Sequence, residues 1–68
     1  MNILQFLNHN GSDKIKVARY HSVYKYTQSV GWIEHDKDDW SSWYFYSDEA
    51  ILLDAVEMKA IVAKIEGL

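Results

Sequence analysis

Residues 34–39, with the sequence EHDKDD, hold the densest group of side chains that could bind a metal or move a proton. We call them the acidic segment. Asp36 and Asp38 have the spacing that begins a calcium-binding EF-hand loop, but the glycine of that loop is missing and Ser47 stands where its bidentate glutamate is needed. The pattern favours a solvated hairpin tip over a metal site. Its four carboxylates also offer a negative surface to a basic partner.

The histidines and serines show no catalytic arrangement. His9, His21 and His35 fall on different predicted elements. His35 and Asp36 are the only adjacent histidine and acid, and they can act together only if they lie in a turn, because neighbouring strand residues point to opposite faces. No Gly-x-Ser-x-Gly motif and no glycine-rich phosphate loop occurs. We therefore predict a protein that is not an enzyme and uses no cofactor or metal.

Aromatic residues follow the acidic segment directly. Trp and Tyr anchor protein interfaces because they bury a large area at a small cost in rotamer entropy. We predict that the carboxylates attract a basic partner and that the rings beside them become its desolvated anchors. The candidate partner-binding residues are Glu34, Asp36, Asp38, Asp39, Trp40, Trp43 and Tyr44.

A tyrosine-rich segment with cations, residues 14–28, offers another kind of surface. Single-stranded nucleic acid stacks its bases on aromatic rings while cations follow its backbone. The residues suited to this are Lys16, Arg19, Tyr20, Tyr24, Lys25 and Tyr26. Packing of these tyrosines in a core is the better interpretation. The alternation of the segment changes phase near Ala18 and Arg19, which predicts a β-bulge or a bend.

The chain ends in a stretch that predicts one long helix. Ser47 is suited to cap its first turn, and Tyr46 and Ile51 have the spacing of a hydrophobic staple. The interior contains no proline or glycine, and Gly67 stands where a left-handed residue would end the helix. We expect the helix to span about residues 47–66.

This predicted helix has two apolar sectors. The first consists of Ile51, Ala55, Met58, Val62 and Ile65. A small sheet covers only one broad face of a helix, so the second sector either enters the same core or meets another chain. This candidate face for a homodimer or a partner consists of Leu52, Leu53, Val56, Ala60 and Ala63.

Upstream of the helix, the pattern indicates strands. Residues 2–8 suit a short strand or two turns of helix, and we favour the strand because residues 9–12 (HNGS) suit a hairpin turn. Further strands are expected at residues 14–28, at residues 30–35 after a turn at Gln28 and Ser29, and from Trp40 or Ser42 to Tyr46. We predict one domain, residues 1–68, of the α+β class: a small antiparallel sheet of three to four strands packed against one C-terminal helix.

The last strand is aromatic on both faces. Trp43 and Phe45 alternate with Tyr44 and Tyr46, and successive strand residues point to opposite sides. Because the helix covers only one face, we expect some of these rings to remain on the surface.

Composition and charge indicate the compartment and the class of partner. The chain has no cysteine, which fits a reducing compartment. Its net charge of −3 divides into +3 over residues 1–33 and −6 over residues 34–68, which disfavours non-specific DNA binding. The N-terminal residues lack the basic region of a signal peptide, and no apolar run approaches a membrane span. We expect a cytoplasmic protein that does not bind membranes.

Together these features predict a small acidic protein-binding module. Small acidic proteins without catalytic motifs are common among phage-encoded inhibitors. A specific form of the prediction is therefore an inhibitor such as an anti-CRISPR protein, which would act in the host cytoplasm by occupying a basic surface of a larger nucleic-acid-handling or defence complex. The alternatives are a homodimer that closes through the C-terminal helix and a weak binder of single-stranded nucleic acid that uses the tyrosine-rich strand.

Overall fold

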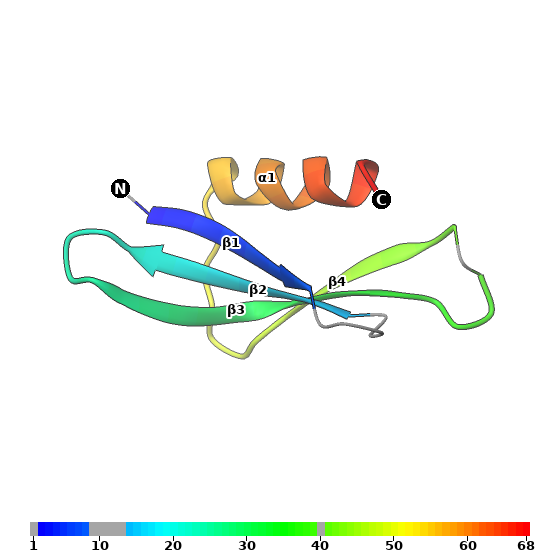
Figure 1. Ribbon diagram of the computed structural model, residues 1–68, viewed down its shortest axis with the longest axis horizontal. Coiled ribbons are helices and arrows are strands. Elements are labelled where there is room, and N and C mark those ends of the chain that lie inside the picture. Colours follow the sequence, from blue (N-terminus) through cyan, green and yellow to red (C-terminus); the bar gives the residue numbers. More distant parts are fainter. Residues whose placement is uncertain (1, 9–13, 40) are drawn as a thin grey trace.

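The computed structural model describes residues 2–8, 14–39 and 41–68 (Figure 1). Four strands precede one helix: β1 (Asn2–Asn8), β2 (Lys14–His21), β3 (Tyr26–His35), β4 (Trp43–Ser47) and α1 (Ala55–Glu66). The strands form one antiparallel sheet in the order β1-β2-β3-β4. The predicted α+β class, the strand at residues 2–8 and the C-terminal helix are confirmed. The predicted turn at residues 9–12 and Trp40 lie outside the described residues.

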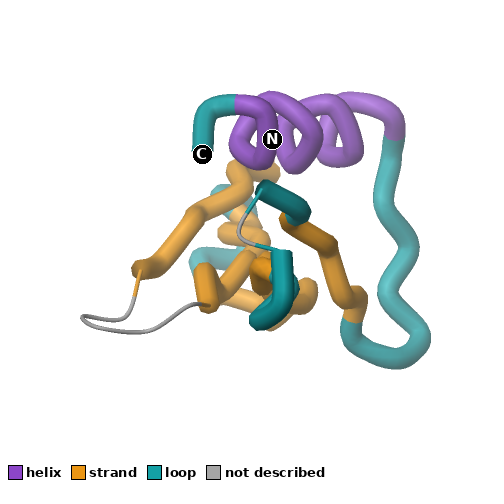
Figure 2. Tube along the Cα trace, turned by 90° about the vertical axis from the view of Figure 1, so that its right-hand side faces the viewer, coloured by secondary structure: helices purple, strands orange, loops and turns teal. Residues whose placement is uncertain are grey.

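The helix α1 lies on one side of the sheet in two perpendicular views (Figures 1 and 2). We call the face toward α1 the inner face and the opposite one the outer face. The core is a cluster in which Ile15, Val17, Val30 and Ile33 of the sheet meet Ile61 of α1. Because such side chains are closely packed, replacing one of them by alanine costs about 2–5 kcal/mol.

The turn between β2 and β3 comes earlier in the chain than predicted. It spans residues 22–25 instead of Gln28 and Ser29, which belong to β3. Lys25 adopts a φ of 56°, and its N–H donates a 2.6 Å hydrogen bond to the carbonyl oxygen of His21. The sequence did not mark this turn because it contains no glycine, asparagine or proline.

A β-bulge interrupts the pairing of β2 with β3, close to the predicted position. Val17 pairs with Gly31 but Ala18 pairs with Ser29, so Val30 is the extra residue and lies in β3. Gly31 has a φ of 156°, and a Cβ on it would collide with a backbone carbonyl oxygen of β4. Glycine is therefore required at this position, where the backbone of β3 beside the bulge lies close to that of β4.

The helix begins later than predicted, because a stronger capping arrangement lies downstream. Ser47 is the last residue of β4, and Ala50 has a φ of 60°, which no helix accommodates. Asp54 caps α1 instead: its Oδ1 accepts a 2.7 Å hydrogen bond from the N–H of Glu57, and the Glu57 carboxylate accepts one of 3.2 Å from the Asp54 N–H. This capping box satisfies two backbone donors at once. The predicted staple at the start of the helix is accordingly wrong.

The predicted C-terminal end of the helix is right, but its conformation is not. α1 ends at Glu66, and Gly67 keeps a right-handed conformation with φ of −85° and ψ of −1°. Its N–H donates to the carbonyl oxygens of Ala63 and Lys64 at 3.2 Å. Gly67 therefore continues the last turn of the helix.

The side of α1 that faces the sheet agrees only in part with the first predicted sector, of which Ile51 and Ile65 pack against the core. Glu57 and Ile61 are its buried residues. Met58 and Val62 of the first predicted sector are about half exposed. Leu52 and Leu53 of the second sector precede the helix, so they cannot form a helical face. Leu53 packs against the core and Ala60 is half-buried, whereas Leu52, Val56 and Ala63 are exposed.

Candidate interaction surface

The outer face of the sheet carries a row of aromatic side chains that α1 does not cover. Lys16 of β2 pairs with Trp32 of β3, which pairs with Tyr46 of β4. Residues opposite one another in an antiparallel sheet share a face, so these three side chains lie together. The rings of Trp32 and Tyr46 are stacked, with centroids 5.2 Å apart and planes 14° from parallel. Tyr44 lies on the same face one row away, and Tyr44 and Tyr46 are 49% and 43% exposed.

Lys14 contacts both a carboxylate and one ring of this aromatic surface. Its ammonium nitrogen lies 3.5 Å from the Glu34 carboxylate and 5.9 Å from the centroid of the Trp32 ring. The Lys14 side chain is about half exposed, so solvent screens the ion pair and its contribution stays below about 1 kcal/mol. The ion pair places Glu34 beside the rings, where Lys14 partly offsets its charge.

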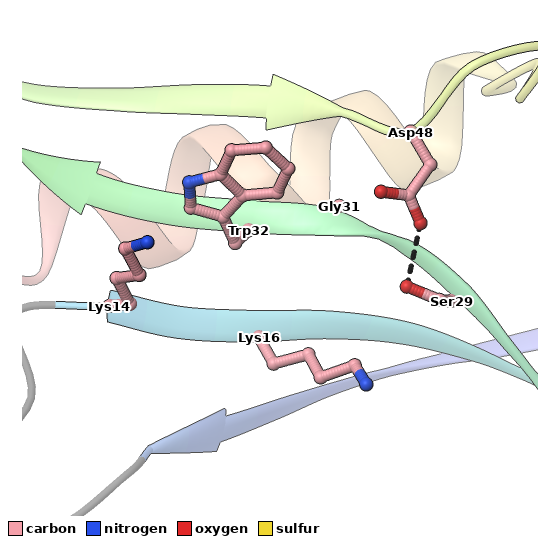
Figure 3. A pocket seen from close by; sticks show the side chains of 6 residues that line it. All are labelled: Lys14, Lys16, Ser29, Gly31, Trp32 and Asp48. Carbon is pink, nitrogen blue, oxygen red and sulfur yellow. Dashed lines mark hydrogen bonds between the residues drawn. The ribbon is translucent and has the colours of Figure 1, made fainter.

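A shallow pocket of about 190 Å³ opens on the outer face beside Trp32 (Figure 3). Its walls include Lys14, Lys16 and Asp48, and Figure 3 shows Trp32 between Lys14 and Asp48. The Asp48 carboxylate accepts a 2.6 Å hydrogen bond from the hydroxyl of Ser29. The indole N–H of Trp32 is buried and has no hydrogen-bond partner among the described residues.

Residues 36–39 of the acidic segment form a hydrogen-bonded negative tip that follows β3. Asp36 donates its backbone N–H to the Ser42 carbonyl oxygen at 2.9 Å, and its carboxylate accepts the Asp38 N–H at 2.8 Å. The Asp39 carboxylate accepts hydrogen bonds from the Ser41 hydroxyl at 2.6 Å and from the Ser42 hydroxyl at 2.7 Å. These hydrogen bonds lower the pKa of Asp39 below its ordinary value. The Asp39 carboxylate therefore keeps its negative charge in mild acid.

The described residues contain no group of three or more histidine, cysteine, aspartate or glutamate side chains placed to hold a metal ion. His35 is buried on the inner face, and its Nδ1 donates a 2.9 Å hydrogen bond to the backbone carbonyl oxygen of Asp36. The imidazole thus contacts the backbone of its acidic neighbour, as expected for a structural histidine.

The predicted aromatic anchors do not share one surface. Trp43 belongs to the inner face, where its ring meets His35 edge-on at 5.0 Å and packs beside the core. Tyr44 points to the outer face because it follows Trp43 in a strand. One flat partner surface cannot contact both rings. Trp40 lies outside the described residues.

The predicted nucleic-acid surface is divided as well. Arg19 is buried on the inner face and forms a bidentate ion pair with Glu57: Nε donates to Oε2 at 2.6 Å and Nη2 to Oε1 at 2.9 Å. Tyr26 stacks on His21 with centroids 4.3 Å apart, on the same side of the sheet. Tyr20 is paired with Thr27 on the outer face. A single strand of nucleic acid cannot reach both sides.

Three features of the outer face were missed by the sequence analysis: Trp32, Tyr46 and Asp48. Trp32 and Glu34 have the same strand phase, and Tyr44 and Tyr46 have the same phase in the next strand. This alternation could have predicted that Trp32, Tyr44 and Tyr46 share one face of the sheet. The missing information was which of the two faces the helix would cover, and that depends on the tertiary structure.

Comparison of the chain with protein-family models, curated proteins and solved structures finds no match. Among the described residues, no helix is long and apolar enough to cross a membrane.

Proposed function

We propose that the protein is a non-enzymatic binding module that holds a protein partner against the outer face of its sheet. The observation that carries this proposal is the stacked pair of Trp32 and Tyr46 beside the exposed Tyr44, on a face that α1 leaves open. Rigid aromatic rings of this kind supply most of the binding energy at protein interfaces. Their order is provided by strand pairing, so little entropy is lost when a partner binds.

The charges around this face support a partner with a basic surface. The outer face of the sheet and the two segments that flank β4 together carry six carboxylates and only three ammonium groups. The carboxylates belong to Glu34, Asp36, Asp38, Asp39, Asp48 and Glu49, and the ammonium groups to Lys14, Lys16 and Lys37. Arginine side chains of a partner would stack on the Trp and Tyr rings and pair with carboxylates at the edge. The acidic segment would steer association and the rings would set the lifetime of the complex.

The narrower form of this proposal is an inhibitor of the phage type that covers a basic surface of a larger host complex. Carboxylates placed like those of the acidic segment compete with phosphates for the same lysine and arginine side chains, which supports a target that handles nucleic acid or acts in defence.

The alternative of a homodimer that closes through the helix has less support. Of the five residues proposed for that face, only Leu52, Val56 and Ala63 are exposed, and Leu52 lies outside the helix. The nucleic-acid alternative also has less support, because its cations and rings lie on both faces of the sheet.

The experiment combines capture of the partner with matched tyrosine variants. The tagged protein is used to isolate the partner, and the dissociation constant is then measured with purified components. Tyr46→Ser is expected to weaken binding about tenfold or more, because an interface anchor contributes about 1–2 kcal/mol or more. Tyr24→Ser is the control, since Tyr24 is strongly exposed in the turn at the far end of β2 and should leave affinity unchanged.

Charge is tested in the same assay. Asp36→Asn together with Asp38→Asn should reduce the association rate most at low salt, whereas Glu66→Gln on the helix should not. Equal affinity of the Tyr46 and Tyr24 variants would remove the outer face from the proposal. Tight, salt-dependent binding of an oligonucleotide that the Tyr46 substitution weakens would replace it by the nucleic-acid alternative.

A further inference from the structure

β1 is an edge strand without the usual protection against pairing. It pairs with β2 on one side and with no described strand on the other (Figure 1). Edge strands leave every second N–H and C=O unpaired, and proteins protect them by charges, proline, bulges or shortness. β1 has seven residues, NILQFLN, with no charge and no proline, and its register with β2 is continuous. It therefore offers a complete template for one more strand.

The side chains of β1 also favour pairing with a further strand. Ile3 and Leu7 lie on the outer face and are 51% and 48% exposed, although both are large and apolar. Leu4 and Phe6 lie on the inner face, half-buried beside the core, and the Lys64 ammonium of α1 lies 5.8 Å from the Phe6 ring centroid. An added strand would cover apolar surface on both faces of the sheet.

The sequence of β1 identifies the added strand. NILQFLN has the same order of polar and apolar residues in both directions, with Gln5 at its centre. Two copies joined antiparallel about a two-fold axis need a strand that is complementary to itself. With the axis at Gln5, Ile3 faces Leu7 of the second copy and Leu4 faces its Phe6. All seven residues overlap in this register, and shifting it by two residues places Gln5 against Ile3 or Leu7.

We propose that two copies of this chain form a dimer by pairing their β1 strands antiparallel, with Gln5 opposite Gln5. The sheet then has eight strands. This register keeps the two outer faces on the same side, so both aromatic surfaces become one continuous face, with both helices on the other side. The dimer does not rest on the proposed function, and it would present two binding surfaces to a partner if both hold.

The other edge strand, β4, is a weaker candidate for this pairing. It has five described residues, WYFYS. Symmetric pairing about Phe45 would place the large Trp43 against the small polar Ser47. Apolar residues match apolar residues across the whole interface only in β1.

The test has two parts. The mass of the protein is measured as a function of its concentration, and charged residues are introduced at the two-fold axis. Light scattering after gel filtration, from micromolar to millimolar protein, should show a shift from 8.0 kDa to twice that mass. Gln5→Lys places two ammonium groups opposite one another and should weaken the dimer about fivefold or more, as should Gln5→Glu with two carboxylates. An equal mixture of the two variants should dimerise again. Thr27→Lys is the control, because Thr27 is exposed and belongs to β3, which is not an edge strand.

A cysteine cross-link tests the register itself. The chain contains no cysteine, so Gln5→Cys supplies a single thiol in each copy and should oxidise to a covalent dimer, whereas Thr27→Cys should not. A protein that remains a monomer at all concentrations overturns the proposal. So does a dimer that Gln5→Lys leaves intact and Val56→Lys dissociates, because that dimer would close through the helix. Circular dichroism of each variant confirms that it is folded.

Discussion

The ion pair of Arg19 and Glu57 is expected to attach the helix to the sheet, and Glu57→Gln tests this. Glu57 is 7% exposed and its carboxylate accepts three hydrogen bonds: two from the Arg19 guanidinium and one from the Asp54 N–H. Arg19 also donates from Nη2 to the Leu52 carbonyl oxygen at 2.7 Å, which fixes the segment before the helix. The hydrogen bonds to Glu57 raise the pKa of Arg19 above its ordinary value, so its charge persists at every ordinary pH.

Removing the negative charge of Glu57 leaves a buried guanidinium without its counter-ion. Such a change costs about 3–5 kcal/mol in buried pairs. A domain of this size has a total stability of only about 3–5 kcal/mol, so we expect a large unfolded fraction at 25 °C. Glu34→Gln is the matched control, because it breaks the exposed pair with Lys14 and should cost less than about 1 kcal/mol.

The assay is urea unfolding followed by tryptophan fluorescence and, separately, by the helical signal in circular dichroism. In a double-mutant cycle, the Arg19→Met/Glu57→Met double variant should be at least about 2 kcal/mol more stable than the sum of the two single substitutions predicts. The reason is that two apolar residues leave no charge unpaired. The reasoning is refuted if Glu57→Gln and Glu34→Gln have the same stability, or if the cycle shows no coupling.

Two further predictions concern the bulge and the acidic segment. Gly31→Ala should cost about 2 kcal/mol or more in urea unfolding, because its Cβ would collide with the β4 backbone, whereas Gly67→Ala, whose Cβ meets nothing closer than 3.6 Å, should be neutral; equal effects would contradict the bulge geometry. The lowered pKa of Asp39 means that its carboxylate stabilises the fold above the ordinary aspartate pKa of about 3.9 and loses this effect as the pH falls through the lowered value. The stability difference between wild type and Asp39→Asn should therefore be present at neutral pH and close in acid, and a difference that is independent of pH would contradict this.

Much of the fold could be predicted because strand patterns are local. The alternation of Trp43 with Tyr44 predicts a strand whose faces are both aromatic, and the phase change near Ala18 predicts a bulge at this level of the sheet, although its extra residue, Val30, lies in the neighbouring strand β3. Side-chain direction alternates along any strand whatever it packs against, so these features can be read from a single segment.

The candidate site was predicted only in part, because it is made of rows that cross three strands. Tyr44 was identified, and Trp32 and Asp48 were not. Trp43 was chosen as an anchor, yet it packs on the inner face. A segment by itself does not say which of its two faces another element will cover.

The sequence by itself determined the class of the fold, the approximate positions of the strands and the end of the helix, because these follow from periodicity and from a run of helix-forming residues that stops at Gly67. The tertiary structure decided which side of the helix is buried, and it reinforces the local capping box at which the helix begins. Ser47 and Asp54 are both good caps by residue type. Asp54 caps the helix because Glu57, three residues on, completes the capping box and meets Arg19 from a strand far away in the sequence. The buried ion pair between distant residues therefore acts in the same direction as the local capping box, and it adds more, since leaving either charge unpaired in the core costs more than a cap contributes.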